Sequence, residues 1–364
     1  MTINFANPNL QYKLYKKEID SAIHRVLSNK NYVLGSEVNQ FENEFAEYIG
    51  VKYSIGVANG TDAIEIALRA LNIGPGDEVL TVSHTATATI AAIMASGAKP
   101  VFADINEDYY TLNFNNIKKL ITKKTKALIL VHLYGQGAHI DEIKKICKEM
   151  KIFLIEDVSQ AHGAKYKNKR LGSFGIISCF SCYPSKNLGA IGDAGIITTN
   201  SKKLKEKMIK LREYGWDSKR ESMFFGRNSR LDELQAAILR IKLKHLDNDN
   251  KKRNIIANQY LELNGKCNII FPKIFVNTEH AFHLFVIRSK KRNLLIKKLN
   301  EKKIFPGIHY RTPNHMHPGF RHFLNNKSDL KITDKISSEI LSLPIYPGLK
   351  TEEVNKICNL IKNF

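Results

Sequence analysis

The chain has 364 residues, 43% of them hydrophobic, which is enough apolar material for a large buried core. Lys and Arg outnumber Asp and Glu by 56 to 35, giving a formal net charge of +21. The basic residues fall in scattered clusters, without interleaved aromatics and without a helix-turn-helix or zinc-finger pattern. We therefore expect lysine-rich solvated faces and no nucleic-acid partner, although a small phosphate-rich substrate is compatible with the charge.

No stretch reaches about 18 uninterrupted apolar residues, so neither a membrane-spanning helix nor a membrane partner is expected. The N-terminal segment lacks an apolar signal core, and the five cysteines lack framework spacing, which together favour a reducing cytoplasm. Cys179 and Cys182 have metal-ligand spacing, but no second pair lies nearby and both fall in an apolar strand. We predict no metal site.

Short apolar runs alternate with helical patterns through the first two-thirds of the chain. Strands are predicted at residues 53–58, 78–82, 101–104, 127–132, 152–156, 176–182 and 194–198. Helices are predicted near 61–71, 86–96, 115–121 and 140–150. This alternation indicates an α/β fold with a mostly parallel seven-stranded sheet covered on both faces. Because no helix fits between the last two strands, the sheet should be mixed near its end.

Helical patterns follow at 201–214, 231–246 and 249–263. From about residue 267 the chain has a short strand region at 281–288, a loop rich in His and Pro at 306–318, and a closing helix at 351–361. We predict a large domain of residues 1–248, including the N-terminal segment, and a smaller C-terminal α/β domain of residues 249–364.

Three segments place polar residues after predicted strands, at 56–68, 154–164 and 180–195, and ligands collect at this edge of parallel α/β sheets. In the first segment, Gly60 allows close backbone approach and Thr61 offers a hydroxyl at a helix N-terminus, which suits a phosphate. An ordinary capped helix that follows a glycine turn would have the same sequence pattern.

The second segment ends an apolar strand with Glu156 and Asp157, and a buried carboxylate there needs a partner such as a protonated pyridine nitrogen. A helix N-cap is the alternative interpretation of Asp157. The third segment places Ser181 and Lys186 in a glycine-rich turn. This pattern fits a partly desolvated, reactive amine near a phosphate, whereas an isolated lysine in such a loop is usually solvated.

Together with residues 226–239 (GRNSRLDELQAAIL), these segments have the order and spacing of a known family. The chain resembles the nucleotide-sugar aminotransferases of the DegT/DnrJ family, which are fold-type-I pyridoxal-phosphate enzymes. The resemblance implies an aspartate-aminotransferase type of fold. It also implies pyridoxal 5'-phosphate as cofactor, pyridoxamine 5'-phosphate in the second half-reaction, and a homodimer with shared active sites.

The resemblance also implies residue roles. Lys186 would hold the cofactor as an imine, and Asp157 would partner the pyridinium nitrogen; both are the catalytic candidates. Gln160 would lie against the ring or its hydroxyl. The phosphate ligands would be Gly60, Thr61 and Ser181, with Asn228 donated by the neighbouring subunit.

One position departs from the family pattern. Where the family usually has an aromatic ring that stacks on the cofactor, this chain has Ala86. We expect that His84 stacks instead or that this face of the ring is covered differently. An ordinary polar strand-end residue is the alternative interpretation of His84.

The substrate end is indicated by the 306–318 loop, where His309 and Tyr310 are expected to contact the sugar, along with Tyr183 from the lysine turn. Residues 307–310 of this loop (Gly-Ile-His-Tyr) resemble the same segment in family members that act on 3-keto-6-deoxy sugars, although Arg311 replaces the family's usual proline. The expected reaction moves an amino group from L-glutamate to a nucleotide-linked keto-6-deoxyhexose, favouring a dTDP-linked 3-keto sugar, for surface glycans such as lipopolysaccharide O-antigen.

Three alternatives stay open at this point. A 4-keto sugar aminotransferase acting on a dTDP-, UDP- or GDP-sugar would carry the same motifs. A sugar dehydratase of the same fold characteristically has His in place of the lysine, so Lys186 counts against it. A protein without turnover is the third alternative. It would be a cofactor-binding regulator, suggested by the charge, or a scaffold with a dead site, against which the presence of Lys186, Asp157 and Ser181 counts.

Overall fold

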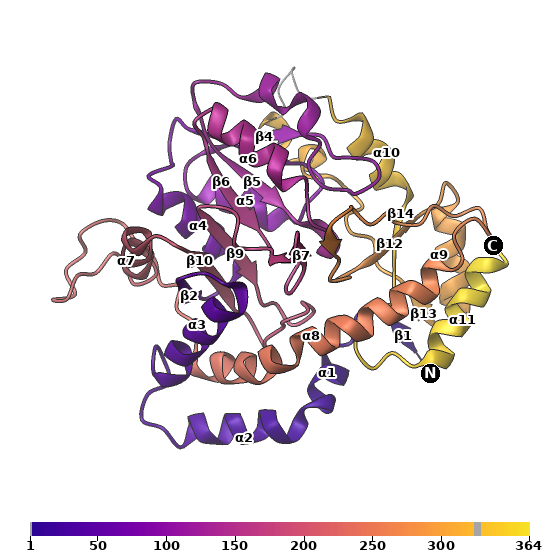
Figure 1. Cartoon of the computed structure of the whole chain (residues 1–364), viewed down its shortest axis with the longest axis horizontal. Helices are drawn as coiled ribbons and strands as arrows, with labels where there is room; N and C mark the ends of the chain where they lie inside the picture. The colour runs from indigo at the N-terminus through magenta and orange to yellow at the C-terminus, as the bar shows by residue number, and fades with distance from the viewer. Residues whose placement is uncertain (1, 324–328) are drawn as a thin grey trace.

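The computed structural model of the chain describes residues 2–323 and 329–364. Its centre is a seven-stranded sheet with the order β2-β10-β9-β6-β5-β3-β4 (Figure 1). Its strands, in chain order, are β2 (Tyr53–Val57), β3 (Glu78–Val82), β4 (Lys99–Ala103), β5 (Thr125–Val131), β6 (Phe153–Asp157), β9 (Ile177–Ser181) and β10 (Gly195–Thr199). β10 is antiparallel to both of its neighbours, and the other pairs are parallel. The predicted α/β class and the reversal after β9 are confirmed.

Helices cover this sheet because their apolar residues recur on one face. In α6 (Ile140–Glu149) the buried residues are Ile140, Ile143, Ile146 and Cys147, a spacing of three and four. The other helices that pack against the sheet are α3 (Ser36–Ile49), α4 (Gly60–Ala70), α5 (Thr87–Ala95) and α7 (Lys202–Leu211). The helix predicted at 115–121 is a short 3₁₀ helix, Phe114–Leu120.

The two helices predicted at 231–246 and 249–263 are one continuous helix, α8 (Glu233–Leu261), so that separation was wrong. The polar run around residue 248 does not break it, because its side chains are bonded to distant groups instead of to the local backbone. Asp249 accepts a hydrogen bond from Tyr15 Oη at 2.7 Å. Asn250 accepts one from Asn187 at 2.8 Å and donates one to the carbonyl of His162 at 2.9 Å.

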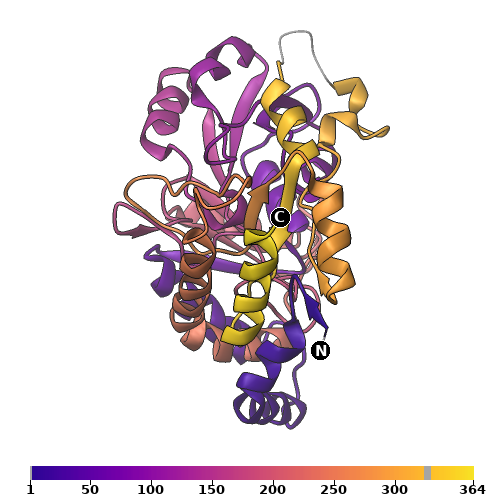
Figure 2. The same cartoon turned by 90° about the vertical axis from the view of Figure 1, so that its right-hand side faces the viewer.

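The residues after α8 form a smaller α/β layer. β12 (Phe285–Arg288) pairs antiparallel with β14 (Ile340–Leu343), and β1 (Ile3–Asn4) pairs parallel with β13 (Ile304–Phe305). The helices here are α9 (Arg292–Glu301), α10 (Lys331–Glu339) and α11 (Thr351–Lys362). In Figure 2 this layer faces the viewer, with both ends of the chain on it. The domain division at residue 248 stays a prediction, and that position lies within α8.

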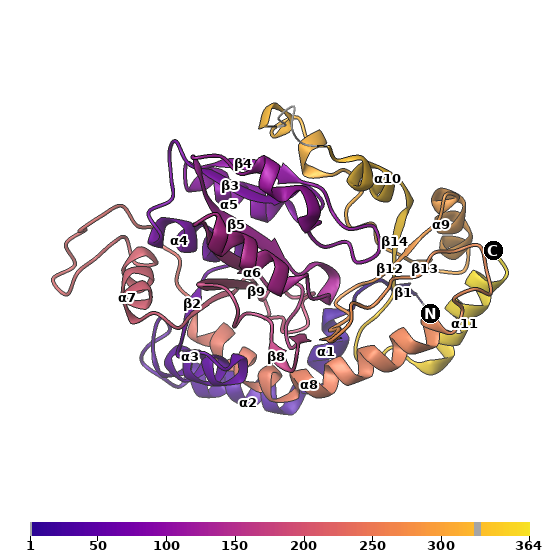
Figure 3. The same cartoon turned by 45° about the horizontal axis from the view of Figure 1, so that its top comes forward.

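The remaining elements lie around α8 and at the edge of the main sheet. α1 (Pro8–Leu14) leads into α2 (Lys16–Leu27), which packs along α8. Figure 3 shows α8 passing from α2 and α3 at one end to α11 at the other. A small sheet consists of β7 (Lys165–Tyr166), β8 (Lys169–Arg170) and β11 (Thr278–Glu279).

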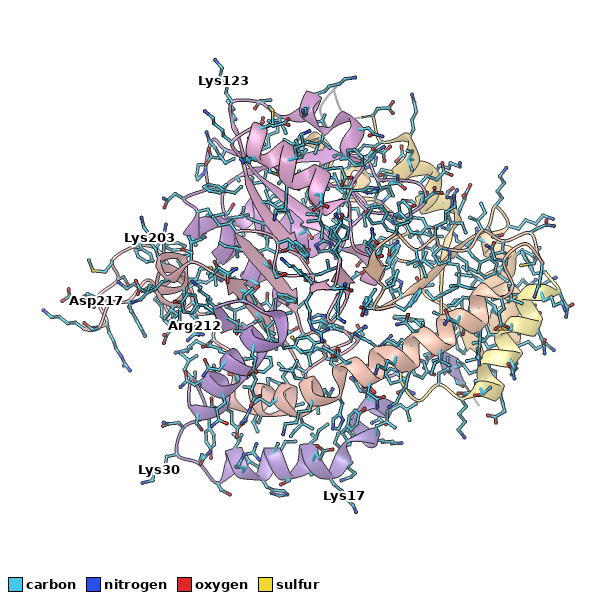
Figure 4. The ribbon with its side chains drawn as sticks, viewed as in Figure 1. Lys17, Lys30, Lys123, Lys203, Arg212 and Asp217 are labelled. Carbon is cyan, nitrogen blue, oxygen red and sulfur yellow. The ribbon has the colours of Figure 1, made fainter. Side chains whose placement is uncertain are left out.

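Surface lysines are distributed over many elements of the fold. Lys17, Lys30, Lys123 and Lys203 point outward from different elements (Figure 4), as expected of solvated faces. Among the described residues, no helix is long and apolar enough to cross a membrane. Within the same residues, no group of three His, Cys, Asp or Glu side chains could hold a metal ion.

A buried carboxylate organises the edge of the sheet next to the polar strand ends. Glu156 in β6 has no exposed surface, yet its two oxygens accept five hydrogen bonds of 2.7–3.0 Å. The donors are His132 Nε2, the backbone N–H groups of Gly172, Phe174 and Gly175, and Ser178 Oγ. These bonds fix the turn before β9 and the end of β5 against β6.

Burial by itself would raise the pKa of Glu156, but the hydrogen bonds from His132, Gly172 and Gly175 outweigh it and hold the pKa below its ordinary value. Nδ1 of His132 accepts the N–H of Ala138 at 3.3 Å, so the ring donates to the carboxylate from Nε2. These donors together stabilise the charge of Glu156 inside the protein.

Replacing Glu156 by Gln is expected to cost about 3 kcal/mol or more of unfolding free energy, because the new NH₂ group faces donors whichever way it is turned. The matched control is Glu149→Gln, an exposed carboxylate paired with Lys118, for which urea denaturation should show little change. Since the folded pKa of Glu156 is lowered, its contribution is present above the ordinary glutamate pKa and is lost as the pH falls. The difference from wild type should therefore persist at neutral pH and shrink in acid; equal stability at neutral pH would contradict this role.

Candidate active site

The ends of β2, β6 and β9 meet at one edge of the sheet and open into a cavity of about 410 Å³. The structure brings nine of the predicted site residues into its lining: Gly60, Thr61, Asp157, Gln160, Ser181, Tyr183, Lys186, His309 and Tyr310. The first seven come from the main sheet side, and the last two come from the 306–318 loop. His84 and Asn228 are not part of the lining.

A helix N-terminus forms one wall of the cavity. α4 begins at Gly60, and Asn59 caps it by accepting the N–H of Asp62 at 2.8 Å. A Cβ added to Gly60 would lie 2.5 Å from Cβ of Ser181, so the start of the helix rests directly on the end of β9. The first-turn amides of a helix have no partners within the helix and favour an anion. This corner therefore fits a phosphate group.

Asp157 lies at the end of β6, only 5% exposed. Its Oδ2 accepts the hydroxyl hydrogen of Thr89 at 2.9 Å, and its Oδ1 accepts the N–H of Ser159 at 3.1 Å. These two bonds set the direction of the carboxylate. A buried carboxylate that lines a cavity is stabilised by a cationic partner there, and a protonated ring nitrogen is such a partner.

Lys186 follows β9 in a tight turn, in which its N–H donates to the carbonyl of Tyr183 at 2.8 Å. Buried Lys242 stabilises the turn, because its Nζ donates to the carbonyl of Gly189 at 2.6 Å. Burial lowers the pKa of Lys186 to about 8, and nearby Asp157 opposes this effect only in part. A lysine of this kind carries a substantial neutral amine fraction near neutral pH, as a nucleophile requires.

Neutral histidines surround the lysine. Burial, with the nearby Lys186 charge, lowers the pKa of His309 to about 4 and that of His283 well below its ordinary value. The side chain N–H groups of Asn187 both donate to carbonyl oxygens, of Asn250 and Ala281, so its own oxygen faces Nδ1 of His283 at 3.2 Å. His283 therefore carries its proton on Nδ1 and presents a free lone pair on Nε2.

The structure places His84 where the expected stacking role does not fit. Its ring is completely buried outside the cavity lining, with Nε2 2.7 Å from the hydroxyl oxygen of Tyr134. Ala86 does line the cavity, together with Ala88. The small side chains leave this wall open where the family usually has a ring.

Asn228 lies on an arm, residues 212–230, that projects beyond α7 (Figure 1). It is exposed, and its backbone bridges to Glu213. Asp217 marks the far end of this arm in Figure 4. The position of Asn228 outside its own cavity is compatible with donation to a second subunit.

The sequence did not single out Thr89 and His283, which line the cavity, or Tyr134, which contacts residues of the lining. Thr89 belongs to the threonine-rich run 85–89, and His283 ends the His-x-x-His pair that precedes β12. Both patterns are visible in the sequence but carry no specific chemistry alone. Tyr134 has no such signal, because its importance rests on partners far away in the chain.

The cavity thus combines an anion corner, a carboxylate opposite it and a lysine of lowered pKa. These are the groups that a phosphorylated pyridine aldehyde needs at its phosphate, its ring nitrogen and its aldehyde carbon. The fold and the site together define a pyridoxal-phosphate-dependent enzyme of the aminotransferase type.

Comparison with known proteins gives the family. Residues 13–362 match the DegT/DnrJ/EryC1/StrS aminotransferase family, and the chain belongs to it. The chain is 45% identical over 350 residues to the dTDP-3-amino-3,6-dideoxy-alpha-D-galactopyranose transaminase of Aneurinibacillus thermoaerophilus, with 96% of each protein covered. It is 36% identical over 367 residues to the UDP-N-acetyl-3-dehydro-alpha-D-glucosamine 3-aminotransferase of Acidithiobacillus ferrooxidans, covering 100% of this chain and 99% of that one.

A solved structure gives the same result. S. venezuelae DesV, in complex with a ketimine intermediate, matches with a TM-score of 0.97 at 38% identity, covering 100% of this chain and 98% of that one. The protein is therefore a nucleotide-sugar aminotransferase, and its cofactor is pyridoxal phosphate.

The lowered pKa of Lys186 predicts unusual amine reactivity in the cofactor-free protein. Its labelling by an amine reagent should rise with pH around a midpoint near 8, because the neutral amine is the reactive form. Competitive labelling followed by peptide mass spectrometry measures this, with the exposed Lys203 as the solvated comparison. A Lys186 profile that coincides with that of Lys203 would contradict the desolvated site.

Gly60→Ala is expected to weaken cofactor binding by about tenfold or more, because the added Cβ forces the start of α4 away from Ser181 and moves the anion-binding amides. Gly319→Ala is the control, since a Cβ there meets no heavy atom within 4 Å. Titration of the cofactor-free proteins, followed by absorbance, gives both affinities. Unchanged cofactor affinity in Gly60→Ala would contradict the assignment of the phosphate site to the start of α4.

Proposed function

We propose that this enzyme transfers the amino group of L-glutamate to C3 of a dTDP-linked 3-keto-6-deoxyhexose. L-glutamate would leave as its 2-keto acid, and the product would be a dTDP-linked 3-amino sugar. The observation that carries the proposal is the desolvated Lys186 in one cavity with Asp157 and the 306–318 loop. We place the reaction in the cytoplasm, where the amino sugar would supply surface glycans such as O-antigen.

Residues of the main sheet would hold the cofactor. Gly60, Thr61 and Ser181 would bind its phosphate, and Asp157 would accept the hydrogen bond of the protonated ring nitrogen. Gln160 would lie against the ring or its hydroxyl. Pyridoxal phosphate, when bound, supplies a conjugated ring that withdraws electrons from the carbon carrying the amino group.

Lys186 would perform the proton transfers. Its Nζ would take the proton from Cα of the amino donor in the first half-reaction, and would supply the proton to C3 of the sugar in the second. The lowered pKa of Lys186 suits this exchange, because an amine that titrates near the working pH can act as both acid and base. Thr89 supports it indirectly, by orienting Asp157.

The sugar would lie beneath the 306–318 loop. His309, Tyr310 and Tyr183 line the cavity, and Tyr183 is 55% exposed at its edge. Both relatives described above carry position 3 in their names, although one is named for a dTDP-sugar and the other for a UDP-sugar. Amination at C3 is therefore better supported than the identity of the nucleotide. The open wall at Ala86 leaves space on this side of the cavity.

We also propose a homodimer with shared active sites, in which Asn228 completes the phosphate site of the neighbouring subunit. The arm that carries Asn228 exposes large apolar side chains, among them Met223 at 60% and Phe225 at 76%. Adjacent exposed apolar side chains of this size are typical of an interaction surface.

An absorbance experiment tests the function. The holoenzyme should show the visible band of lysine-bound pyridoxal phosphate, L-glutamate should remove it, and a dTDP-linked 3-keto-6-deoxyhexose should restore it. Lys186→Ala should lack the band and lose about a thousandfold or more in kcat. Initial rates should follow ping-pong kinetics, because the two substrates use one site in turn.

Each failure of this experiment has a separate meaning. No band after incubation with pyridoxal phosphate would overturn the cofactor assignment for this chain. If another amino acid removes the band and L-glutamate does not, that amino acid is the donor instead. Restoration by 4-keto sugars, but not by 3-keto sugars, would move the reaction to C4.

A further inference from the structure

The 306–318 loop is tied down on both sides of the two residues that reach the cavity. On one side, the backbone of Gly307 exchanges two hydrogen bonds with that of Ser342 in β14, at 2.8 and 3.0 Å. On the other side, Asn314 donates to the carbonyls of Ser83 and Thr85 at 3.0 and 2.8 Å. His309 and Tyr310 lie between these anchors.

A buried tyrosine joins this middle part to the main sheet. The hydroxyl of Tyr134, which follows β5, donates to the carbonyl of His309. The backbone N–H of Tyr134 donates to Oε1 of Gln160 at 2.8 Å, and Nε2 of Gln160 donates to the hydroxyl of Tyr310 at 2.9 Å. Tyr134 and Gln160 therefore hold the two loop residues from the cofactor side.

The chemistry of these groups fixes which atom donates. A carbonyl oxygen only accepts, so the single hydroxyl hydrogen of Tyr134 is used by His309. The oxygen of Tyr134 must then accept from His84, whose Nε2 lies 2.7 Å away. His84 is therefore protonated on Nε2 and sets the rotation of the tyrosine hydroxyl.

Burial makes this chain of bonds strong. His84 has no exposed surface, and Tyr134 is 3% exposed. Burial lowers the pKa of His84 to about 4 and raises the pKa of Tyr134 well above its ordinary value, so both side chains stay neutral at physiological pH. Where water is excluded, a carbonyl that loses its donor is left unsatisfied at a substantial cost.

We propose that Tyr134, with its hydroxyl oriented by His84, is a positioning residue that fixes His309 and Tyr310 over the cavity for the sugar substrate. The fixing of the loop stands on the geometry alone, and its effect on the sugar rests on the proposed function. The same geometry gives His84 a role that replaces stacking on the cofactor.

Tyr134→Phe tests the loop directly, because it removes the hydroxyl and keeps the ring. Hydrogen–deuterium exchange of the holoenzyme should show backbone amides of the 306–318 loop exchanging about tenfold faster. The matched control is Tyr260→Phe, which removes another fully buried hydroxyl donated to a backbone carbonyl, that of Pro344 at 2.8 Å. This control should lower stability without loosening the loop.

Kinetics separate the two substrates. In Tyr134→Phe, KM for the keto-sugar should rise about tenfold, while the absorbance change with L-glutamate stays within about twofold of wild type. A purely structural loss would affect both half-reactions and would resemble Tyr260→Phe. If the wild-type protein turns over no keto-sugar, the proposed function fails, and the exchange experiment still decides the loop.

His84→Phe distinguishes positioning from stacking. Phenylalanine is a good stacking ring but cannot donate to Tyr134. We expect the same loosened loop as in Tyr134→Phe, an unchanged cofactor spectrum, and no added effect in the double variant. Loop exchange equal to wild type in Tyr134→Phe, or a changed cofactor spectrum with a protected loop in His84→Phe, would overturn the proposal.

Discussion

The carboxylate of Glu156 is completely buried, and the edge of the sheet that carries the site is assembled around it. Its partners come from the end of β5, the turn before β9 and the first residues of β9 itself, all drawn onto one side chain of β6. Its neighbour Asp157 points into the cavity. The hydrogen bonds to Glu156 thus fix the ends of β6 and β9 relative to each other. They thereby also fix the positions of Asp157, Ser181 and Lys186.

The site has two sides with different tasks. The main sheet supplies rigid strand ends, a helix N-terminus and the lysine turn, which together suit a cofactor that stays in place. The 306–318 loop supplies His309 and Tyr310 from the other side of the cavity. There they would contact the substrates, which bind and leave in turn. Tyr134 and Gln160 connect the two sides, and neither belongs to the loop that they hold.

Local pattern was enough to predict the strands and to place polar residues at their ends. Continuous apolar runs predicted all seven strands within a few residues, and the short interval before β10 predicted its reversal, because both depend on neighbours in the chain. Lys186, Asp157 and Gly60 stood out by their positions at strand ends, but their roles came from the resemblance to the family. The break near residue 248 was predicted wrongly because Asp249 and Asn250 find partners more than 60 residues away. Likewise, nothing near His84 in the sequence indicates that its ring meets Tyr134, because only the fold brings the two together.

The uninterrupted α8 has a consequence for how substrates enter and leave. Its 29 residues span about 44 Å, contacting α2 and α3 at one end and α11 at the other. A wide hinge motion between these ends would have to break backbone hydrogen bonds in the middle of the helix, where Asn250 is also tied to two other segments. An intact α8 therefore limits how far the elements at its two ends can move apart. An amino donor and a sugar nucleotide would have to reach the cavity without such a wide opening.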